Sequence, residues 1–299
     1  MGITGARGRF VPIVAEYLRK KGVAVTTFSR KACVQHEALA VLLEPAILSE
    51  YDAILHFGWG TVPKDSEEKQ GAEWQKDLPF ISKLLQALGQ LPEKQRPILV
   101  FPSTGAVYGE CGNEPAIEAT ALAPKSYYAA GKVAAEELLH QYSAHGQGKV
   151  AILRISNLYG AQGVSKVPQG VMAKLAGCFH KNTKPTIWGD GTATKDYLHV
   201  DDFCEALYRV LAERLEGVWN LCTGTSHSLL EVLSIFSKHL KWNPDCVFLP
   251  HPSWDVEKTN ISPQKLITAT GWIPKKELEQ GIRDYLSTSA GSYQKGKRA

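Results

Sequence analysis

The sequence predicts an α/β protein with a doubly wound parallel sheet and a smaller, interleaved lobe toward the C-terminus. In the first half of the chain, short runs rich in β-branched and aliphatic residues alternate with helical patterns. Strands that are separated by helices form βαβ units, whose right-handed crossovers make the strands parallel. In the second half, helical segments alternate with short extended pieces and many Gly, Pro and Asn residues. This irregular part predicts the smaller lobe.

Each element is predicted from its apolar periodicity and its stop signals. In 12–21, Ile13, Val14, Tyr17 and Leu18 share one helical face, and Gly22 follows as a stop. In chain order we predict a strand at Ile3, a helix over 12–21, strands over 23–28 and 53–57, a helix over 78–88, a strand over 98–101, a helix over 128–143 and a strand over 150–155. Helices near 170–180, 201–214 and 227–240 follow.

Composition is ordinary for a globular protein and excludes several functional classes. Of the 299 residues, 44% are hydrophobic and 21% charged, and the formal net charge is +4. The one basic cluster, Lys295, Lys297 and Arg298, is predicted to be a solvated tail, so we expect no nucleic-acid partner. No apolar run approaches the ~20 residues of a membrane span, so we expect no membrane association.

The cysteines and the first residues predict the compartment. None of the six cysteines is spaced as Cys-x-x-Cys, so the sequence predicts no metal site and no redox pair. A chain of this length buries a core without cross-links, which favours reduced thiols in a cytosol. The sequence enters Gly2-Ile3-Thr4-Gly5 without a basic-then-apolar segment, and we therefore expect a cytoplasmic location.

A glycine-containing loop joins the first strand to the first helix. Gly5 and Gly8 would let the backbone approach a pyrophosphate, and the helix N-terminus offers free N–H groups and a positive dipole end. A glycine pair alone also fits a tight turn, but the strand–loop–helix context favours a dinucleotide site in a Rossmann-like domain. Val11 stands where a third glycine is usual, and that glycine serves helix–strand packing rather than binding.

The end of the second strand bears on which cofactor binds. Dinucleotide folds that use NAD usually place an acidic residue here, and this chain has Ser29 and Arg30 instead. Ser29 cannot replace the carboxylate, whereas Arg30 could pair with a 2′-phosphate. We therefore favour NADP over NAD. The alternative is that Arg30 is simply an exposed strand-end residue and that NAD binds.

Three residues form the predicted chemical centre. Tyr128 and Lys132 are four apart on a helix, so they share one face. A nearby ammonium favours the phenolate and should lower the pKa of Tyr128 toward a useful range. Thr104 ends a buried strand, where α/β sheets present catalytic groups, and could hydrogen-bond the same substrate oxygen. Each signal alone is weak, since a surface Tyr–Lys pair or a turn threonine is equally common.

Taken together, these segments resemble the extended short-chain dehydrogenase/reductases, specifically the NAD-dependent epimerase/dehydratase family (UDP-galactose-4-epimerase-like). The resemblance covers nearly the whole chain in order. It rests on Ser103-Thr104 before Val107-Tyr108-Gly109, on Pro124, Ser126, Tyr128 and Lys132, on 153–160, on Trp188-Gly189-Asp190-Gly191, on 196–202, on Asn220 and Gly224, and on 271–274 and 278–281.

The resemblance implies roles for particular residues. Tyr128 would be the general base and acid, Lys132 would tune it and hold the nicotinamide ribose, and Thr104 would orient the sugar oxygen. Asn157 would contact the substrate. Trp188 would border the nucleotide base, although an ordinary core aromatic is the alternative. Gly5 and Gly8 would face the pyrophosphate.

Two departures affect the substrate diphosphate. The family usually has Arg before the late Asp-Tyr pair, and this chain has Lys195, a point charge in place of a bidentate fork. The family also often has Arg three residues before Asp255, and here that residue is Pro252. Lys195, with Lys258, would have to bind the diphosphate.

The reaction depends on the pocket. Relatives that eliminate water usually have Asp-Glu after the catalytic Ser/Thr, and this chain has Gly105-Ala106, so 4,6-dehydration is not expected. That segment and the run from Val167-Pro168-Gln169-Gly170 to Gly191 look most like epimerases, which pass through a transient 4-keto sugar. An NADPH-dependent 4-ketoreductase of a nucleotide-linked deoxysugar uses the same three residues, and Arg30 favours it. A non-catalytic cofactor-binding protein is a minor alternative, against which the intact Thr104, Tyr128 and Lys132 argue.

We expect residues 1–165 to form the dinucleotide-binding domain, with 195–215 returning to it. Residues 166–290 would form most of the substrate lobe, and 291–299 a tail. The resemblance implies a nucleotide-diphosphate sugar as substrate and a homodimer with the 128–143 helix in a shared four-helix contact. The sequence specifies neither the sugar nor the base.

Overall fold

A seven-stranded, all-parallel sheet forms the centre of the protein. The computed structural model of the chain describes residues 1–160 and 170–295. The strand order is β10-β6-β5-β4-β1-β2-β3. The strands are β1 (Gly2–Thr4), β2 (Thr26–Ser29), β3 (Glu37–Ala38), β4 (Ala53–His56), β5 (Ile98–Thr104), β6 (Val150–Ile155) and β10 (Gly217–Leu221). The chain first winds outward through β2 and β3 and then crosses back to β4, so the order reverses beside β1, where such folds bind ligands.

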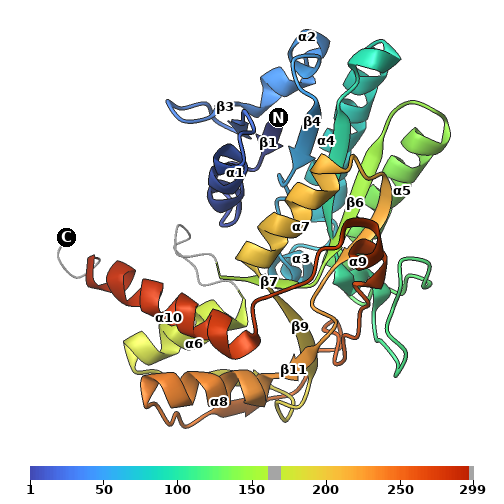
Figure 1. Cartoon of the computed structure of the whole chain (residues 1–299). Coiled ribbons are helices and arrows are strands. Elements are labelled where there is room, and N and C mark those ends of the chain that lie inside the picture. Colours follow the sequence, from blue (N-terminus) through green and yellow to red (C-terminus); the bar gives the residue numbers. More distant parts are fainter. Residues whose placement is uncertain (161–169, 296–299) are drawn as a thin grey trace.

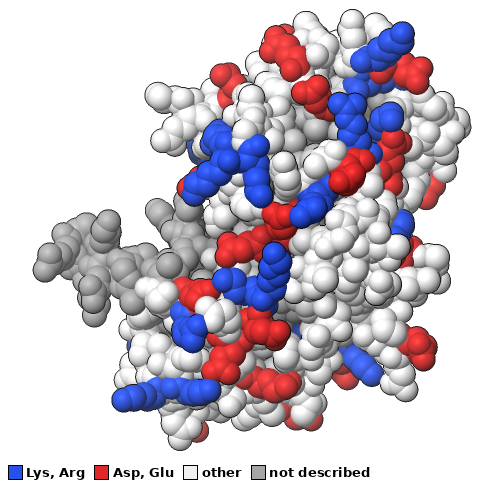
Figure 2. Space-filling view, viewed as in Figure 1, with Lys and Arg blue, Asp and Glu red and all other residues white. Residues whose placement is uncertain are grey.

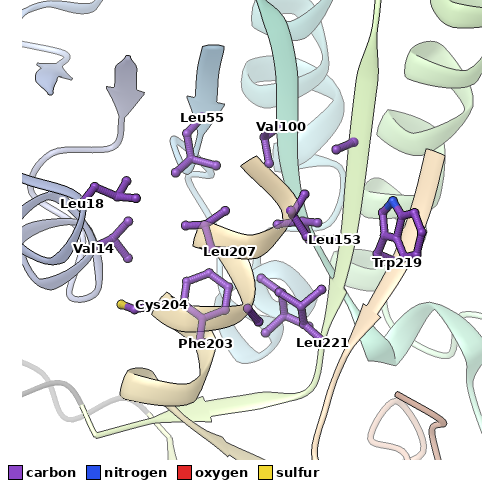
Figure 3. Packing of buried hydrophobic residues seen from close by; sticks show 14 of the residues in the cluster. Val14, Leu18, Leu55, Val100, Leu153, Phe203, Cys204, Leu207, Trp219 and Leu221 are labelled. Carbon is purple, nitrogen blue, oxygen red and sulfur yellow. The ribbon is translucent and has the colours of Figure 1, made fainter. Parts of the chain in front are cut away.

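Helices cover both faces of this sheet, as the predicted doubly wound fold requires (Figure 1). On one face, α1 (Val11–Lys20) and α7 (Val200–Ala212) bury Val14, Leu18, Phe203 and Leu207 in one cluster with Leu55, Val100 and Leu153 of the strands. Figure 3 shows these side chains meeting between the helices and the sheet. The other face packs on α4 (Ala72–Gly89) and α5 (Tyr127–Ala144). The predicted fold class is therefore confirmed.

The strands are apolar throughout because both of their faces are buried. Neighbouring residues of β4 show this. Ile54 packs in the cluster between the sheet and helices α4 and α5, while Leu55 packs in the cluster between the sheet and helices α1 and α7, on the opposite face. Both side chains are fully buried.

The smaller lobe contains two short sheets and three helices. Strands β7 (Asn157–Tyr159), β9 (Thr194–His199) and β11 (Ser226–Ser228) form one sheet, and β8 (Thr186–Trp188) pairs with β12 (Val247–Leu249). Helices α6 (Val171–Lys181), α8 (Leu229–Leu240) and α10 (Leu278–Lys295) surround a third apolar cluster (Figure 1). The short helices are α2 (Pro45–Leu48), α3 (Pro63–Glu68) and α9 (Gln264–Thr270), with 3-10 turns at Leu39–Leu43, Glu93–Gln95 and Gly105–Tyr108.

The two parts interleave more deeply than the predicted boundaries. After α7 the chain adds β10 to the large sheet, and Leu266 of α9 packs in the cluster below α1 and α7. The part of the chain that returns to the seven-stranded sheet thus extends beyond the predicted residues 195–215.

Two element boundaries differ from the predictions for local reasons. The predicted strand over 23–28 begins only at Thr26, because the Val23 N–H still bonds the Leu18 carbonyl at the end of α1. The helix predicted over 78–88 begins at Ala72, and Pro79 lies inside it. Its extra first turns carry Glu73 and Asp77, which are both buried.

Surface charge is mixed on the face shown in Figure 2, where Lys and Arg alternate with Asp and Glu and no continuous basic band appears. Among the helices of residues 1–160 and 170–295, none is long and apolar enough to cross a membrane.

Truncation of Phe203 should destabilise the fold strongly. Phe203 is fully buried in α7, and its ring meets that of Phe57 edge-on at 6.0 Å. We expect Phe203→Ala to lower the free energy of unfolding by about 3–5 kcal/mol, measured by urea denaturation. Phe248→Ala is the matched control, since Phe248 is 56% exposed and its loss should cost under about 0.5 kcal/mol. Equal losses in the two variants would contradict this packing.

Candidate active site

The glycine loop after β1 lies against the backbone that follows β4. Gly5 has φ +76°, and a Cβ there would lie 2.9 Å from the carbonyl carbon and oxygen of Phe57. The Gly8 N–H donates to the Gly5 carbonyl at 2.7 Å, and a Cβ on Gly8 would lie 3.0 Å from that oxygen. Only glycine fits this cradle, which leads directly into α1. The loop therefore fits the backbone approach that a dinucleotide pyrophosphate needs.

Val11, at the place of the usual third glycine, is buried at the start of α1. It belongs to the same apolar cluster as Val14 and Leu18. Helix α1 has no side-chain cap at its N-terminus.

The end of β2 places the two residues that were expected to select the cofactor. Ser29 is buried, and its hydroxyl donates to the carbonyl of Lys31. Arg30 is exposed, and its charge acts on Asp77 of α4 across the carboxyl end of the sheet.

Helix α5 positions the predicted catalytic pair. Ser126 caps the helix by accepting the Ala129 N–H at 3.1 Å, which explains the serine two residues before Tyr128. Lys132 is 3% exposed and donates from Nζ to the Pro102 carbonyl of β5 at 2.8 Å. Its ammonium lies 4.0 Å from the Trp59 ring centre and 5.9 Å from that of Tyr128.

The protonation of this pair differs from the expectation. Burial lowers the pKa of Lys132 to about 7, while Asp77 and Glu136 oppose the shift. Burial, with the negative charges of Glu73 and Asp77, raises the pKa of Tyr128 to about 12. The expected lowering of the tyrosine pKa is therefore not found for the protein groups alone, because burial and, after it, the negative charges of Glu73 and Asp77 disfavour the phenolate.

Thr104 and Tyr128 line one pocket between the two lobes. Its wall also includes Asn157, Lys195 and Trp254. The Thr104 oxygen accepts the Ala106 N–H at 3.2 Å, so its hydroxyl proton can be donated into the pocket. Asn157 is exposed to the pocket, and its side-chain nitrogen donates to the Asp196 carbonyl at 3.2 Å. Four of the predicted site residues are thus brought together from four separate segments.

The predicted cations for a diphosphate are already engaged. Lys195 donates to Asp255 at 3.2 Å and to the carbonyl of Val256. Lys258 bonds Asn113 at 3.2 Å and does not line the pocket. Trp188 meets Trp254 edge-on at 5.3 Å, and Lys174 of α6 lies 5.3 Å from the Trp188 ring centre. Within the described part of the chain, Lys174 forms no ion pair.

The late motif is mainly structural. Asp196 is fully buried and accepts from the Thr223 N–H and hydroxyl and from the Gly224 N–H, all at 2.8–3.1 Å. It therefore fixes the turn after β10.

Two buried histidines, His56 and His199, make structural hydrogen bonds. The ring of His199 accepts the Asp201 N–H at the start of α7, and His56 bonds Thr4 at 2.8 Å. Among the described residues, no group of His, Cys, Asp or Glu is arranged to hold a metal ion.

Comparison with known proteins identifies the family. Residues 1–222 match the NAD dependent epimerase/dehydratase family. The chain belongs to this family. The predicted resemblance is therefore confirmed.

Individual relatives agree in sequence and in structure. A putative UDP-glucose 4-epimerase of Methanocaldococcus jannaschii is 31% identical over 186 residues, which are 62% of this chain and 60% of that protein's length. UDP-glucose 4-epimerase 4 of Oryza sativa subsp. japonica is 27% identical over 79% of this chain and 69% of its own. The Thermus thermophilus UDP-glucose 4-epimerase, solved with NAD, has a TM-score of 0.82 at 29% identity, covering 96% of this chain and 97% of that one.

The structure brings three residues to this family site that the sequence did not indicate. Trp59 lies in the loop after β4, and Glu73 and Asp77 lie in the first turns of α4. These three residues belong to no sequence motif. The one signal in the sequence that could have indicated them is the spacing of Glu73 and Asp77, two acids four residues apart in a segment that forms a half-apolar helix. Of the segment 167–170, only Gly170 is within the described residues.

The buried ammonium should make stability depend on pH. The pKa of Lys132 is about 7 in the folded protein and about 10.4 in an unfolded chain, so the unfolded state binds more protons between these values. Stability should therefore rise with pH from about 7 to about 9, by up to ~1.4 kcal/mol per pH unit, relative to Lys132→Met. Urea denaturation at several pH values measures this difference. Lys83→Met, which removes an exposed lysine of α4, is the control and should retain the wild-type slope of unfolding free energy against pH. If Lys132→Met also retained the wild-type slope, the buried charge of Lys132 would be contradicted.

Proposed function

We propose that this protein is a nucleotide-sugar epimerase that acts through a transient 4-keto sugar. One observation carries the proposal: Thr104 and Tyr128 face a single pocket, with Lys132 one helical turn behind. The glycine cradle at Gly5 and Gly8 supports a nicotinamide dinucleotide beside that pocket. The Thermus relative, named as a UDP-glucose 4-epimerase and solved with NAD, supports both parts.

The residues divide the proton chemistry between them. When bound, a nicotinamide dinucleotide would supply the hydride acceptor and then the hydride donor. Tyr128 would take the proton from the sugar C4 hydroxyl and return it after the sugar has turned. Thr104 would donate its hydroxyl proton to the same oxygen, and Lys132 would hold the nicotinamide ribose. Because the pKa of Tyr128 is about 12 with protein groups alone, the positive charge needed to form the phenolate must come largely from the ligand.

The pocket geometry argues against dehydration. A Cβ on Gly105 would lie 2.5 Å from Ile261 Cδ1, so no acidic side chain fits after Thr104 without repacking. Ala106 supplies no acid either. The three residues Thr104, Tyr128 and Lys132 then suffice for epimerisation, which needs no further acid or base.

A nucleotide diphosphate is the substrate class that the aromatic and basic residues support. Trp188 and Trp254 offer ring faces and edges beside the pocket, as a base requires. Lys195 shares its charge with Asp255, and Lys174 adds a cation over Trp188. We infer that Lys174 takes part of the role that arginines have elsewhere in the family. UDP is the nucleotide of the named epimerase relatives.

A 4-ketoreductase with NADPH is the second candidate, and the exposed Arg30 favours it. The NAD in the Thermus relative points instead to NAD as the cofactor.

We further propose that the predicted domains correspond to a cofactor part and a substrate part. A homodimer through α4 and α5 is supported by Trp74 and Tyr127, which are 43% and 39% exposed on these helices.

An isotope experiment separates the two reactions. The purified protein is incubated with UDP-glucose carrying deuterium at C4, and the products are analysed by NMR. An epimerase should yield UDP-galactose that retains the deuterium at C4, without net oxidation of added cofactor. Stoichiometric NADPH oxidation with a 4-keto sugar nucleotide, and no conversion of UDP-glucose or UDP-N-acetylglucosamine, would replace the epimerase by the reductase.

Tyr128→Phe should keep cofactor binding and lose turnover. Removal of a general base and acid costs about 10²–10⁴-fold in rate. Tyr127→Phe is the matched control, since this neighbouring tyrosine is 39% exposed and should leave kcat unchanged. Retention of more than a few per cent of the activity in Tyr128→Phe would remove the role assigned to it.

Arg30→Ala should weaken NADPH binding at least about tenfold and NADH binding much less, because only NADPH carries the 2′-phosphate. Isothermal titration of both cofactors measures this ratio. Lys31→Ala, the adjacent exposed cation, is the control. Equal weakening of NADPH and NADH by Arg30→Ala would leave NAD as the natural cofactor.

A further inference from the structure

Two buried acids on α4 stand out because, among residues 1–160 and 170–295, no cation forms an ion pair with either of them. Glu73 is fully buried and Asp77 is 6% exposed, and they lie one helical turn apart on the same face. Carboxylates are rarely buried unless each is paired, since the charge costs much free energy in a low-dielectric surrounding. Their retention calls for a partner.

The hydrogen bonds of the two acids leave one oxygen of each free. Glu73 Oε1 accepts from the hydroxyls of Thr61 and Ser66, and Asp77 Oδ1 accepts the Gly60 N–H at 2.9 Å. Glu73 Oε2 and Asp77 Oδ2 are buried without a hydrogen-bond partner. The indole N–H of Trp59 is also buried and unpaired.

The acids lie beside the proposed catalytic pair and outside the pocket proposed for the substrate. Gly131, between Tyr128 and Lys132, makes room for Glu73, since a Cβ on Gly131 would lie 2.8 Å from Glu73 Cγ. Neither acid lines the pocket that holds Thr104 and Asn157. Asp77 instead bonds the loop after β4, whose backbone forms the cradle of Gly5. The acids are therefore placed to act by their charge on the cofactor rather than on the sugar.

The charges at this point do not balance within the protein. Inside the protein, two carboxylates face one buried ammonium, Lys132, whose hydrogen bond goes to the Pro102 carbonyl and not to either acid; the other cation that acts on Asp77, Arg30, is exposed to solvent. A nicotinamide ring carries one positive charge when oxidised and none after it has accepted a hydride. The oxidised ring therefore supplies the missing charge, and the reduced ring does not.

We propose that Glu73 and Asp77 make the site select the oxidised nicotinamide over the reduced one. The inference rests on the nicotinamide site of the proposed function. The acids act as specificity-determining residues through charge, and they transfer no proton. Their consequence for the reaction is direct: a protein that holds the oxidised form is poised to remove hydride from a sugar alcohol. The pair thus favours epimerisation over reduction by exchangeable NADPH.

The test compares dissociation constants for the oxidised and reduced forms of one cofactor, NAD⁺ with NADH and NADP⁺ with NADPH. Each comparison isolates the ring charge, because the phosphates are the same in both forms. Asp77→Asn and Glu73→Gln keep the side-chain shape and remove the charge. We expect each variant to shift the oxidised-to-reduced affinity ratio about tenfold toward the reduced form, as expected for loss of one nearby charge in a partly desolvated site.

Glu68→Gln is the control, because Glu68 is an exposed acid on the preceding helix α3. The oxidised-to-reduced affinity ratio of this variant should equal that of the unaltered chain. If Glu73→Gln does not fold, Asp77→Asn alone decides. An unchanged ratio in Asp77→Asn, with normal sugar epimerisation by the unaltered chain, overturns this inference and leaves the proposed function intact. If the unaltered chain binds none of the four nucleotides, the proposed function is overturned as well.

Discussion

The buried ion pair between Arg154 of β6 and Glu136 of α5 is the interaction on which the active site depends. Its atoms approach to 2.7 Å, and the two side chains are 5% and 2% exposed. Ser103 of β5 also donates to Glu136, so one carboxylate joins the helix to two neighbouring strands. Glu136 lies one turn after Lys132, and Ser103 precedes Thr104. The pair therefore sets the position of all three predicted catalytic residues at once.

The same arginine extends this constraint to β10 and to the loops beside it. Arg154 donates to the Tyr108 hydroxyl at 3.0 Å, and Tyr108 donates to Asn220 of β10 at 2.7 Å. Asn220 in turn donates to the carbonyls of Ala116 and Ser262. A buried charge that lost its partner here would cost about 3–5 kcal/mol. The network thus holds the segments that frame the pocket in one arrangement, which hydride transfer requires of its reacting groups.

The surroundings of Tyr128 differ inside and outside the pocket. Hydroxyl and amide groups, Thr104 and Asn157, line the pocket with it. Glu73 and Asp77 lie outside the pocket, and burial together with their negative charges raises the pKa of Tyr128 to about 12, which disfavours its phenolate. This charge distribution is the basis of the proposed preference for a cationic cofactor.

The sequence by itself determined the fold class, the family and the local motifs. Apolar runs buried on both faces specify parallel strands, and glycines that a Cβ would block, such as Gly5, are visible as a pattern. Tyr128 and Lys132 are related by helical spacing alone.

Only the tertiary structure decided which charges meet. Helix α4 begins a turn and a half earlier than its apolar pattern indicates, because its first turns are held by Glu73 and Asp77 rather than by apolar contacts. The engagement of Lys195 by Asp255, sixty residues away, could not be read from local spacing either. Burial and pairing depend on segments far apart in the chain, and these two quantities control the pKa values and the ligand preference of the site.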